Sequence, residues 1–99
     1  MVKRRIVWDD PAKIYLKKSL EFIRRDSPQN ADKIRNEIRI IIKEIPAHPE
    51  RYPADKYRLN NDGAYRALEI YSYRISYYIG DNEIRIVRIK HTSQEPLNY

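Results

Sequence analysis

Two dipeptides, Asp10-Pro11 and Ser27-Pro28, most strongly limit how this chain can fold. Aspartate and serine favour the position just before a helix, and proline fits the first helical position, where its missing N–H needs no partner. Each pair therefore predicts a helix start. The first helix should run to about Arg25, and Pro46 should end the second. Only about two or three residues separate the helices, so the sequence predicts an antiparallel helical hairpin.

Both predicted helices carry apolar side chains three or four residues apart, a spacing that places them on one side of a helix. Each helix is therefore expected to bury one face against a neighbour. The expected core positions are Ala12, Leu16, Leu20 and Ile23 in the first helix, and Ala31, Ile34, Ile38, Ile41 and Ile45 in the second.

The rest of the chain has the alternation and residue types of β-strands. A first strand is expected over residues 3–8, before the helices. A loop with three prolines covers residues 46–55, and the turn signals Asn60–Gly63 and Gly80–Asn82 separate later segments. The strands expected after the loop cover residues 56–59, 65–71, 73–79 and 83–90.

The order β-α-α-β-β-β-β predicts an α+β fold with an N-terminal strand, an antiparallel helical hairpin and a curved, mainly antiparallel sheet. The hairpin should pack on one face of the sheet, which leaves the other face free to bind a partner. Because 99 residues have room for only one hydrophobic core, residues 1–99 are expected to form a single domain.

Strand alternation places the charged side chains of the last two strands. In residues 73–79 the apolar set alternates with Arg74, so Arg74 should point to the free face. In the last strand Ile84 and Ile86 have one parity, whereas Val87 and Ile89 have the other, which predicts a β-bulge near residues 86–87. Beyond the bulge, Arg88 and Lys90 should project opposite to Val87 and Ile89, and His91 should end the strand.

Composition limits the partners that this chain can have. Its net charge of +6 favours an acidic partner, either nucleic acid or protein, although the charge is spread along the chain and fits a role in solubility equally well. The absence of cysteine excludes disulfides and suits a reducing cytoplasm. No apolar run approaches the roughly 20 residues of a membrane helix. A cytoplasmic protein without membrane contact is therefore expected.

The residue types of the last third of the chain suit RNA cleavage without a metal. Such cleavage needs a base for the 2′-hydroxyl, an acid for the leaving oxygen and cations for the charge that develops on the phosphate. His91 is the candidate base or acid, and Arg74, with Arg66 or Lys56, is the candidate phosphate holder. Tyr78 or Tyr99 could stack on a base. Three further cations, Arg58, Arg88 and Lys90, are candidate nucleic-acid contacts.

Structural interpretations of the same residues stay open. Tyrosine favours strands, so most of the nine tyrosines are expected to serve packing, and a histidine at a strand end is often a surface residue. Arg66 and Arg85 can equally be solvated. The two histidines lie far apart in the chain and no acidic cluster accompanies them, so neither a metal nor a cofactor is expected.

Several segments in this order resemble the RelE/ParE superfamily, the toxins of bacterial type II toxin–antitoxin modules. Their order and spacing across nearly all 99 residues carry the resemblance, and the fold of the superfamily agrees with the one predicted above. The segments are residues 6–8, Asp26-Ser27-Pro28 with Ala31, His48-Pro49, Tyr65-Arg66, residues 73–77, residues 84–91 and Gln94-Glu95-Pro96.

The resemblance implies a growth-inhibiting toxin that a cognate antitoxin binds and neutralises in a hetero-oligomer. The superfamily contains two mechanisms. RelE-like members cut mRNA on the ribosome, and ParE-like members inhibit DNA gyrase and lack a clear catalytic set. The first mechanism leads our expectation, with gyrase inhibition as the alternative and a non-toxic nucleic-acid-binding or protein-binding module as the third possibility.

The resemblance assigns roles to single residues of the RelE type. Arg74 matches an arginine that stabilises phosphate in RelE-like chains, and Tyr99 matches a tyrosine that stacks on mRNA. Arg66 lies near a position where those chains place a lysine. A second lysine has no counterpart here, because Leu68 or Glu69 stands at its position. Thr92 and Ser93 follow His91, where RelE-like chains often carry another cation.

Overall fold

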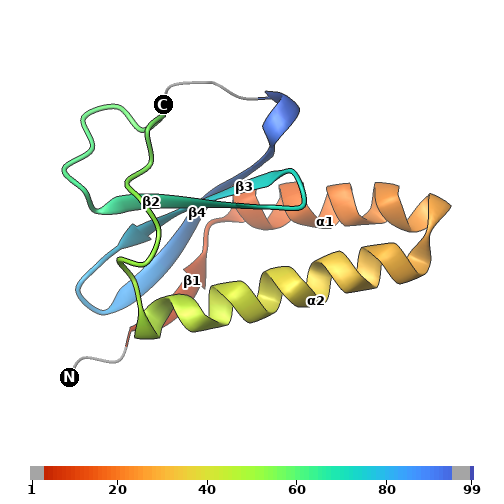
Figure 1. Cartoon of the computed structure of the whole chain (residues 1–99), viewed down its shortest axis with the longest axis horizontal. Helices are drawn as coiled ribbons and strands as arrows, with labels where there is room; N and C mark the ends of the chain where they lie inside the picture. Colours follow the sequence, from red (N-terminus) through yellow and green to blue (C-terminus); the bar gives the residue numbers. More distant parts are fainter. Residues whose placement is uncertain (1–3, 95–98) are drawn as a thin grey trace.

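The computed structural model describes residues 4–94 and residue 99. It has a helical hairpin and a four-stranded mixed sheet with the strand order β1-β4-β3-β2 (Figure 1). The predicted α+β class, with a strand, a helical hairpin and then a sheet, is confirmed. The helices are α1 (Asp10–Asp26) and α2 (Pro28–Glu44), and the strands are β1 (Arg5–Trp8), β2 (Tyr65–Ile70), β3 (Tyr73–Ile79) and β4 (Glu83–His91).

Some predicted features fall wholly or partly outside the described residues. These are the first residue of the expected strand over 3–8 and the last two residues of the motif Gln94-Glu95-Pro96. Two short 3-10 helices complete the described structure: η1 (Ile45–Ala47) follows α2, and η2 (Thr92–Gln94) follows β4. No helix within the described ranges is both long and apolar enough to cross a membrane.

Proline and serine set the helix boundaries much as the sequence predicts. Ser27 ends α1 and also caps α2, whose first residue is Pro28, and its hydroxyl accepts a hydrogen bond from the Asn30 N–H at 3.2 Å. The turn between the antiparallel helices is thus one residue long. The first cap differs from the prediction, because Asp9 rather than Asp10 precedes α1 and makes no side-chain capping bond. Its carboxylate instead pairs with Arg85 at 2.7 Å.

The hairpin packs on one face of the sheet, and the core lies between these two layers (Figure 1). Ile38 on α2 and the alternating residues Ile75 and Tyr77 on β3 are fully buried there. The buried face of α2 is shifted slightly from the predicted one, since Ile42 is buried and Ile41 is only partly buried. Burial of these large side chains is the main force that holds the hairpin to the sheet.

The predicted bulge is present in β4. Ser76 of β3 pairs with Arg88, whereas the next residue, Tyr77, pairs with Ile86, so Val87 is the extra residue. This shift lets both Ile86 and Ile89 enter the core although their parities differ. The edge strand β1 adds to β4 in parallel, with Ile6 opposite Ile84.

The segment over residues 56–59, expected as a short strand, consists of turns. Its only ladder contact nearby is an isolated bridge between Ala54 and Arg66. The segment therefore belongs to a long connection from α2 to β2. The connection pairs with β2 only at this bridge, through backbone hydrogen bonds from the Asp55 N–H to the Tyr65 carbonyl and from the Ala67 N–H to the Pro53 carbonyl. Beyond the bridge, the side chains of Asp55 and Asn61 hold the connection by hydrogen bonds to its backbone.

Candidate functional site

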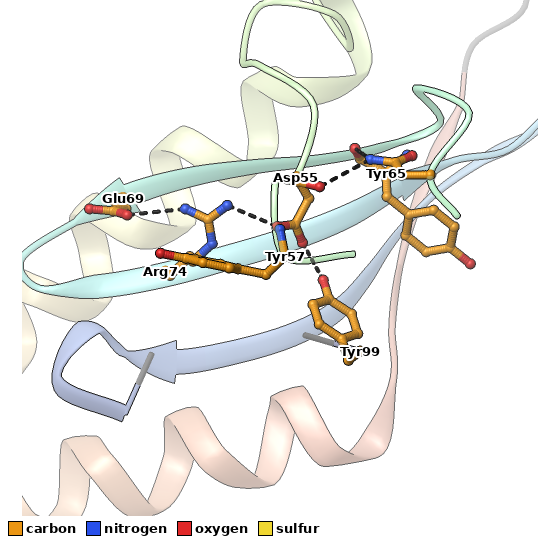
Figure 2. Close-up of polar contacts among 7 residues, drawn as sticks. Asp55, Tyr57, Tyr65, Glu69, Arg74 and Tyr99 are labelled. Carbon is orange, nitrogen blue, oxygen red and sulfur yellow. Dashed lines mark hydrogen bonds and ion pairs between the residues drawn. The ribbon is translucent and has the colours of Figure 1, made fainter. Parts of the chain in front are cut away.

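A buried aspartate anchors this connection on the face of the sheet that lies opposite the helices. We call this face the outer face, and on β3 it carries Arg74, Ser76 and Tyr78, which alternate with the core residues. Asp55 from the connection is only 2% exposed and lies over Arg74 (Figure 2). Its carboxylate accepts hydrogen bonds from Arg74 Nη2 at 2.8 Å, from the Tyr57 N–H at 3.1 Å and from the Tyr99 hydroxyl.

Arg74 is enclosed by the same group of residues. Its Nη1 donates to Glu69 Oε2 at 3.1 Å, and its guanidinium lies 4.7 Å from the centre of the Tyr57 ring (Figure 2). Arg74 is 6% exposed, so its charge is offset by two carboxylates and almost shielded from water. We call Asp55, Tyr57, Glu69, Arg74 and Tyr99 the Asp55 network.

The network fixes the charge state of its members. Burial raises the pKa of Asp55, but the hydrogen bonds from Arg74 and Tyr99 outweigh it and hold this pKa below its usual value. Burial, together with the hydrogen bond to Asp55, raises the pKa of Tyr99 to about 12. At neutral pH the network therefore contains a carboxylate, a guanidinium and an uncharged phenol.

Asn61 gives the connection its shape. Its amide nitrogen donates to the carbonyl oxygens of Asp55 and Tyr65, at 3.2 and 2.8 Å. Its side-chain oxygen accepts from the backbone N–H groups of Gly63 and Tyr65, at 2.9 and 3.1 Å. Asparagine provides both donors and an acceptor, so one side chain closes this turn and places Asp55 over β3.

Next to the Asp55 network, the outer face has a hollow of about 480 Å³. We call it the outer groove. Its walls hold three arginines and three tyrosines, so its character is basic and aromatic. The lining residues are Asp9, Arg58, Tyr65, Tyr78, Arg85, Val87, Arg88 and Tyr99.

The arginines and tyrosines of the outer groove stack on one another. The Arg58 guanidinium lies 3.9 Å from the centre of the Tyr65 ring and 5.2 Å from that of Tyr99. Arg88 lies 4.7 Å from the Tyr99 ring, and the Tyr65 and Tyr78 rings are 5.0 Å apart. Such cation–π contacts hold both kinds of side chain in place, so the groove offers preformed arginine forks beside flat aromatic surfaces.

His91 lies on the other side of the sheet from Arg74. The register pairs it with the core residue Tyr73, and the two rings meet edge to face with centroids 5.9 Å apart. Its Nδ1 accepts a hydrogen bond from the Ser93 N–H at 3.1 Å and lies 2.8 Å from the Ser93 hydroxyl. The bulge settles which face His91 takes, because Arg74 pairs with Lys90 rather than with His91.

Residues 6–96 match the family described as the ParE toxin of the type II toxin–antitoxin system parDE. The chain belongs to this family of ParE toxins. The RelE/ParE superfamily expected from the sequence is thereby confirmed.

Two solved structures share the ParE-type fold with low sequence identity. The chromosomal ParDE system of P. aeruginosa contains a chain with a TM-score of 0.70 and 18% identity, over 90% of this chain and 96% of that one. The YoeB dimer of Staphylococcus aureus has a TM-score of 0.56 and 17% identity, over 90% and 97%. No curated protein sequence matches this chain.

In this ParE-family chain the three residues predicted to be catalytic do not come together. Arg66 pairs with Tyr77 and so has the parity of the core face, like His91, whereas Arg74 has the parity of the outer face. Arg66 is held by two backbone carbonyls, those of Gly63 and Tyr52, each at 3.0 Å. Its position therefore fits a structural role in the connection.

The residues predicted to bind nucleic acid are brought together in part. Arg58, Tyr78, Arg88 and Tyr99 all line the outer groove. Lys56 is exposed on the connection, with its Nζ 5.2 Å from the centre of the Tyr57 ring. Lys90 does not line the groove. Its Nζ lies 4.8 Å from the centre of the Tyr15 ring of α1.

Sequence reasoning missed three residues of this face. Tyr65 belongs to an expected strand and to a segment that resembles the superfamily, and Arg85 can be solvated, but neither is predicted to bind nucleic acid, although both line the outer groove. Asp55 received no role. The signal available for Asp55 was its place after the prolines, three residues before Arg58, but nothing in that spacing indicates an ion pair with Arg74. Among the described residues no group of three histidine, aspartate or glutamate side chains could hold a metal ion.

Proposed function

We propose that this ParE-family toxin arrests growth by binding DNA gyrase, without catalysis, and that an antitoxin neutralises it. The observation that carries this proposal is the separation of Arg74 from His91 on opposite faces of the sheet. Gyrase inhibition by binding is the ParE-like mechanism of the superfamily, and RNA cleavage is the RelE-like one.

Acid–base cleavage needs its groups within hydrogen-bonding reach of one substrate. His91 has the parity of the core face, and its Nδ1 bonds to Ser93. Arg74 is buried, and its charge is already offset by Asp55 and Glu69. A phosphate held at Arg74 would have to displace a carboxylate and also enter the core of the Asp55 network. These contacts favour a structural role for Arg74 over a catalytic one.

The outer groove suits a protein target. Arginine and tyrosine are the residue types that most often dominate binding at protein interfaces, and those of the groove are already ordered by their mutual stacking. An acidic loop or helix end of the target could meet Arg58 and Arg88, and an apolar side chain could meet Tyr78. Binding by a preformed surface requires no acid or base.

RNA cleavage on the ribosome is the second candidate, because the same groove also fits single-stranded RNA. Arginines beside tyrosine rings can hold phosphates and stack bases. The four predicted residues Arg58, Tyr78, Arg88 and Tyr99 do line this one groove. In this alternative the phosphate contacts come from Arg58 and Arg88 instead of Arg74.

Induction of variants in a bacterium separates the two candidates. His91→Ala should arrest growth as strongly as the unchanged chain, with transcripts intact in primer extension and with plasmid DNA losing its negative supercoils. The double variant Arg58→Ala/Arg88→Ala should weaken the arrest at least tenfold in viable counts. Its matched control is Arg25→Ala/Arg51→Ala, which changes two exposed arginines that do not line the groove and should remain fully toxic.

Cut transcripts together with normally supercoiled plasmid would contradict the gyrase proposal and favour RNA cleavage. Unimpaired growth with the unchanged, folded chain would contradict both candidates. Far-ultraviolet circular dichroism of each purified variant shows whether a loss of toxicity reflects a loss of fold.

A further inference from the structure

Leu59 is an apolar side chain that the fold leaves exposed beside the outer groove. It is 56% exposed and belongs to the connection, which loops out beyond the start of β2 (Figure 1). Arg58, the residue before it, lines the outer groove. The Leu59 N–H donates a hydrogen bond to the carbonyl oxygen of Tyr99, which is another residue of the groove wall. The leucine therefore stands at the edge of the surface that we propose to bind the target.

Hydrogen bonds hold the backbone on both sides of Leu59. Before it, the Arg58 N–H donates to the Asp55 carbonyl oxygen at 3.3 Å. After it, the side-chain amide of Asn61 donates to the same carbonyl oxygen at 3.2 Å. The loop thus presents the leucine in a defined position before a partner arrives. A side chain presented in this way loses less conformational entropy on binding than one on a mobile loop.

Apolar packing does not explain why the chain holds this loop so firmly. Single exposed leucines are common on protein surfaces and need no explanation by themselves. Here, however, residues 55–62 add no side chain to the hydrophobic core. A buried ion pair between Asp55 and Arg74, together with the stacking of Arg58 on two tyrosine rings, holds the segment instead. Such a segment is suited to the presentation of side chains to a partner.

The charges of the loop define the kind of partner that fits Leu59. Two cations accompany it, Lys56, which is exposed, and Arg58. The two carboxylates of residues 55–62 are already engaged, Asp55 by its ion pair and Asp62 by a hydrogen bond from a backbone N–H. A matching surface has an apolar pocket for the leucine and carboxylates around that pocket for the cations. RNA offers phosphates to the cations but no apolar pocket, so the combination favours a protein.

We propose that Leu59 is the apolar anchor of the target interface and that it enters an apolar pocket of DNA gyrase whose rim is acidic. The proposal rests on the proposed function, because it takes gyrase as the target. Arg58 joins both parts of the interface, since its guanidinium stacks inside the outer groove and its backbone leads directly to Leu59. Burial of a leucine that water surrounds in the free protein strengthens binding, and truncation to alanine removes that gain.

Supercoiling of relaxed plasmid by purified gyrase and ATP tests the proposal. Leu59→Ala should raise the concentration of the chain that halves supercoiling about tenfold. Leu59→Met keeps a side chain of similar volume and should change this concentration less than threefold. The matched control is Ile14→Ala, which removes as many carbon atoms from a side chain that is 50% exposed on α1 and does not line the outer groove. It should also change the concentration less than threefold.

Binding kinetics on immobilised gyrase separate the leucine from the cations. Leu59→Ala should speed dissociation and leave association nearly unchanged, because most interface substitutions act on dissociation. Lys56→Glu should instead slow association, and this effect should fade as the salt concentration rises. Its control is Lys18→Glu, the same charge reversal at an exposed position of α1, which should slow association less.

Two results of the supercoiling assay would overturn the proposal while the proposed function stands. They are equal inhibition by the unchanged chain and Leu59→Ala, and equal losses of inhibition in Leu59→Ala and Ile14→Ala. If the unchanged, folded chain leaves gyrase fully active, both the proposal and the proposed function fail.

Sedimentation of the purified chain alone supplies one more outcome. A dimer that Leu59→Ala dissociates would place a second copy of the chain on Leu59 and would overturn the proposal. Because Leu59 is exposed, its substitution should leave the melting temperature nearly unchanged. If Leu59→Ala does not fold, Leu59→Gln replaces it, since glutamine keeps the length of the side chain and carries a polar end.

Discussion

Asp55 joins three parts of the molecule that are far apart in the sequence. It is a residue of the connection, it pairs with Arg74 of β3, and it accepts a hydrogen bond from Tyr99. A buried charge pair adds little when compared with an apolar replacement, but the removal of one partner leaves the other charge buried alone. The removal of either Asp55 or Arg74 is therefore expected to destabilise the fold.

Asp55→Asn should lower the free energy of unfolding by about 3–5 kcal/mol at pH 7, because Arg74 would keep only Glu69. In the folded chain the pKa of Asp55 lies below that of an aspartate in the unfolded chain. The stabilisation that the ionised Asp55 gives is therefore complete above the unfolded-state pKa and is lost as the pH falls through the folded-state pKa. The unchanged chain should lose stability below about pH 4, and the variant should show a shallower pH dependence.

Urea unfolding across this pH range measures both effects. Asp32→Asn is the control, because Asp32 also has a lowered pKa but lies exposed in its ion pair with Arg24. Its loss should change stability far less. Equal stability losses in the two variants would show that burial of Asp55 does not govern the network.

At the scale of elements, the two helices and the last three strands could be predicted because local signals mark them. Proline with a capping residue marks the helix starts, and alternation marks the strands. The parity change in β4 even located the bulge at Val87. The connection over residues 48–64 could not be predicted, since its course depends on a distant ion pair and on the side-chain bonds of Asn61.

The turn between β2 and β3 contains backbone strain that a substitution can relieve. Tyr71 and Ser72 both have positive φ, of 51° and 64°, where residues other than glycine are disfavoured. Ser72→Gly should therefore raise the free energy of unfolding by about 1 kcal/mol and the melting temperature by several degrees. Calorimetry can measure this gain.

Asn82→Gly serves as the comparison for Ser72→Gly. Asn82 is an exposed turn residue without positive φ, so glycine should only add freedom to the unfolded chain and lower stability slightly. A gain in stability for Asn82→Gly, or none for Ser72→Gly, would contradict the strain at the β2–β3 turn.

At the scale of the whole molecule, the sheet separates two basic surfaces. The outer groove combines arginines with tyrosines, and two hollows on the helical side combine lysines and arginines with apolar side chains of β1, α1 and α2. The sequence indicated an acidic partner from net charge but could not divide that charge between two faces. It also left open whether Arg74 and His91 share one groove, because the face of His91 depends on a one-residue bulge and on pairing across the sheet.

Supercoiling by purified DNA gyrase tests the central claim most directly. Relaxed plasmid, gyrase and ATP are incubated with increasing amounts of the purified chain or of His91→Ala. The account predicts that both proteins block supercoiling to the same extent and that added antitoxin restores it. Complete supercoiling in the presence of excess folded chain would contradict the account.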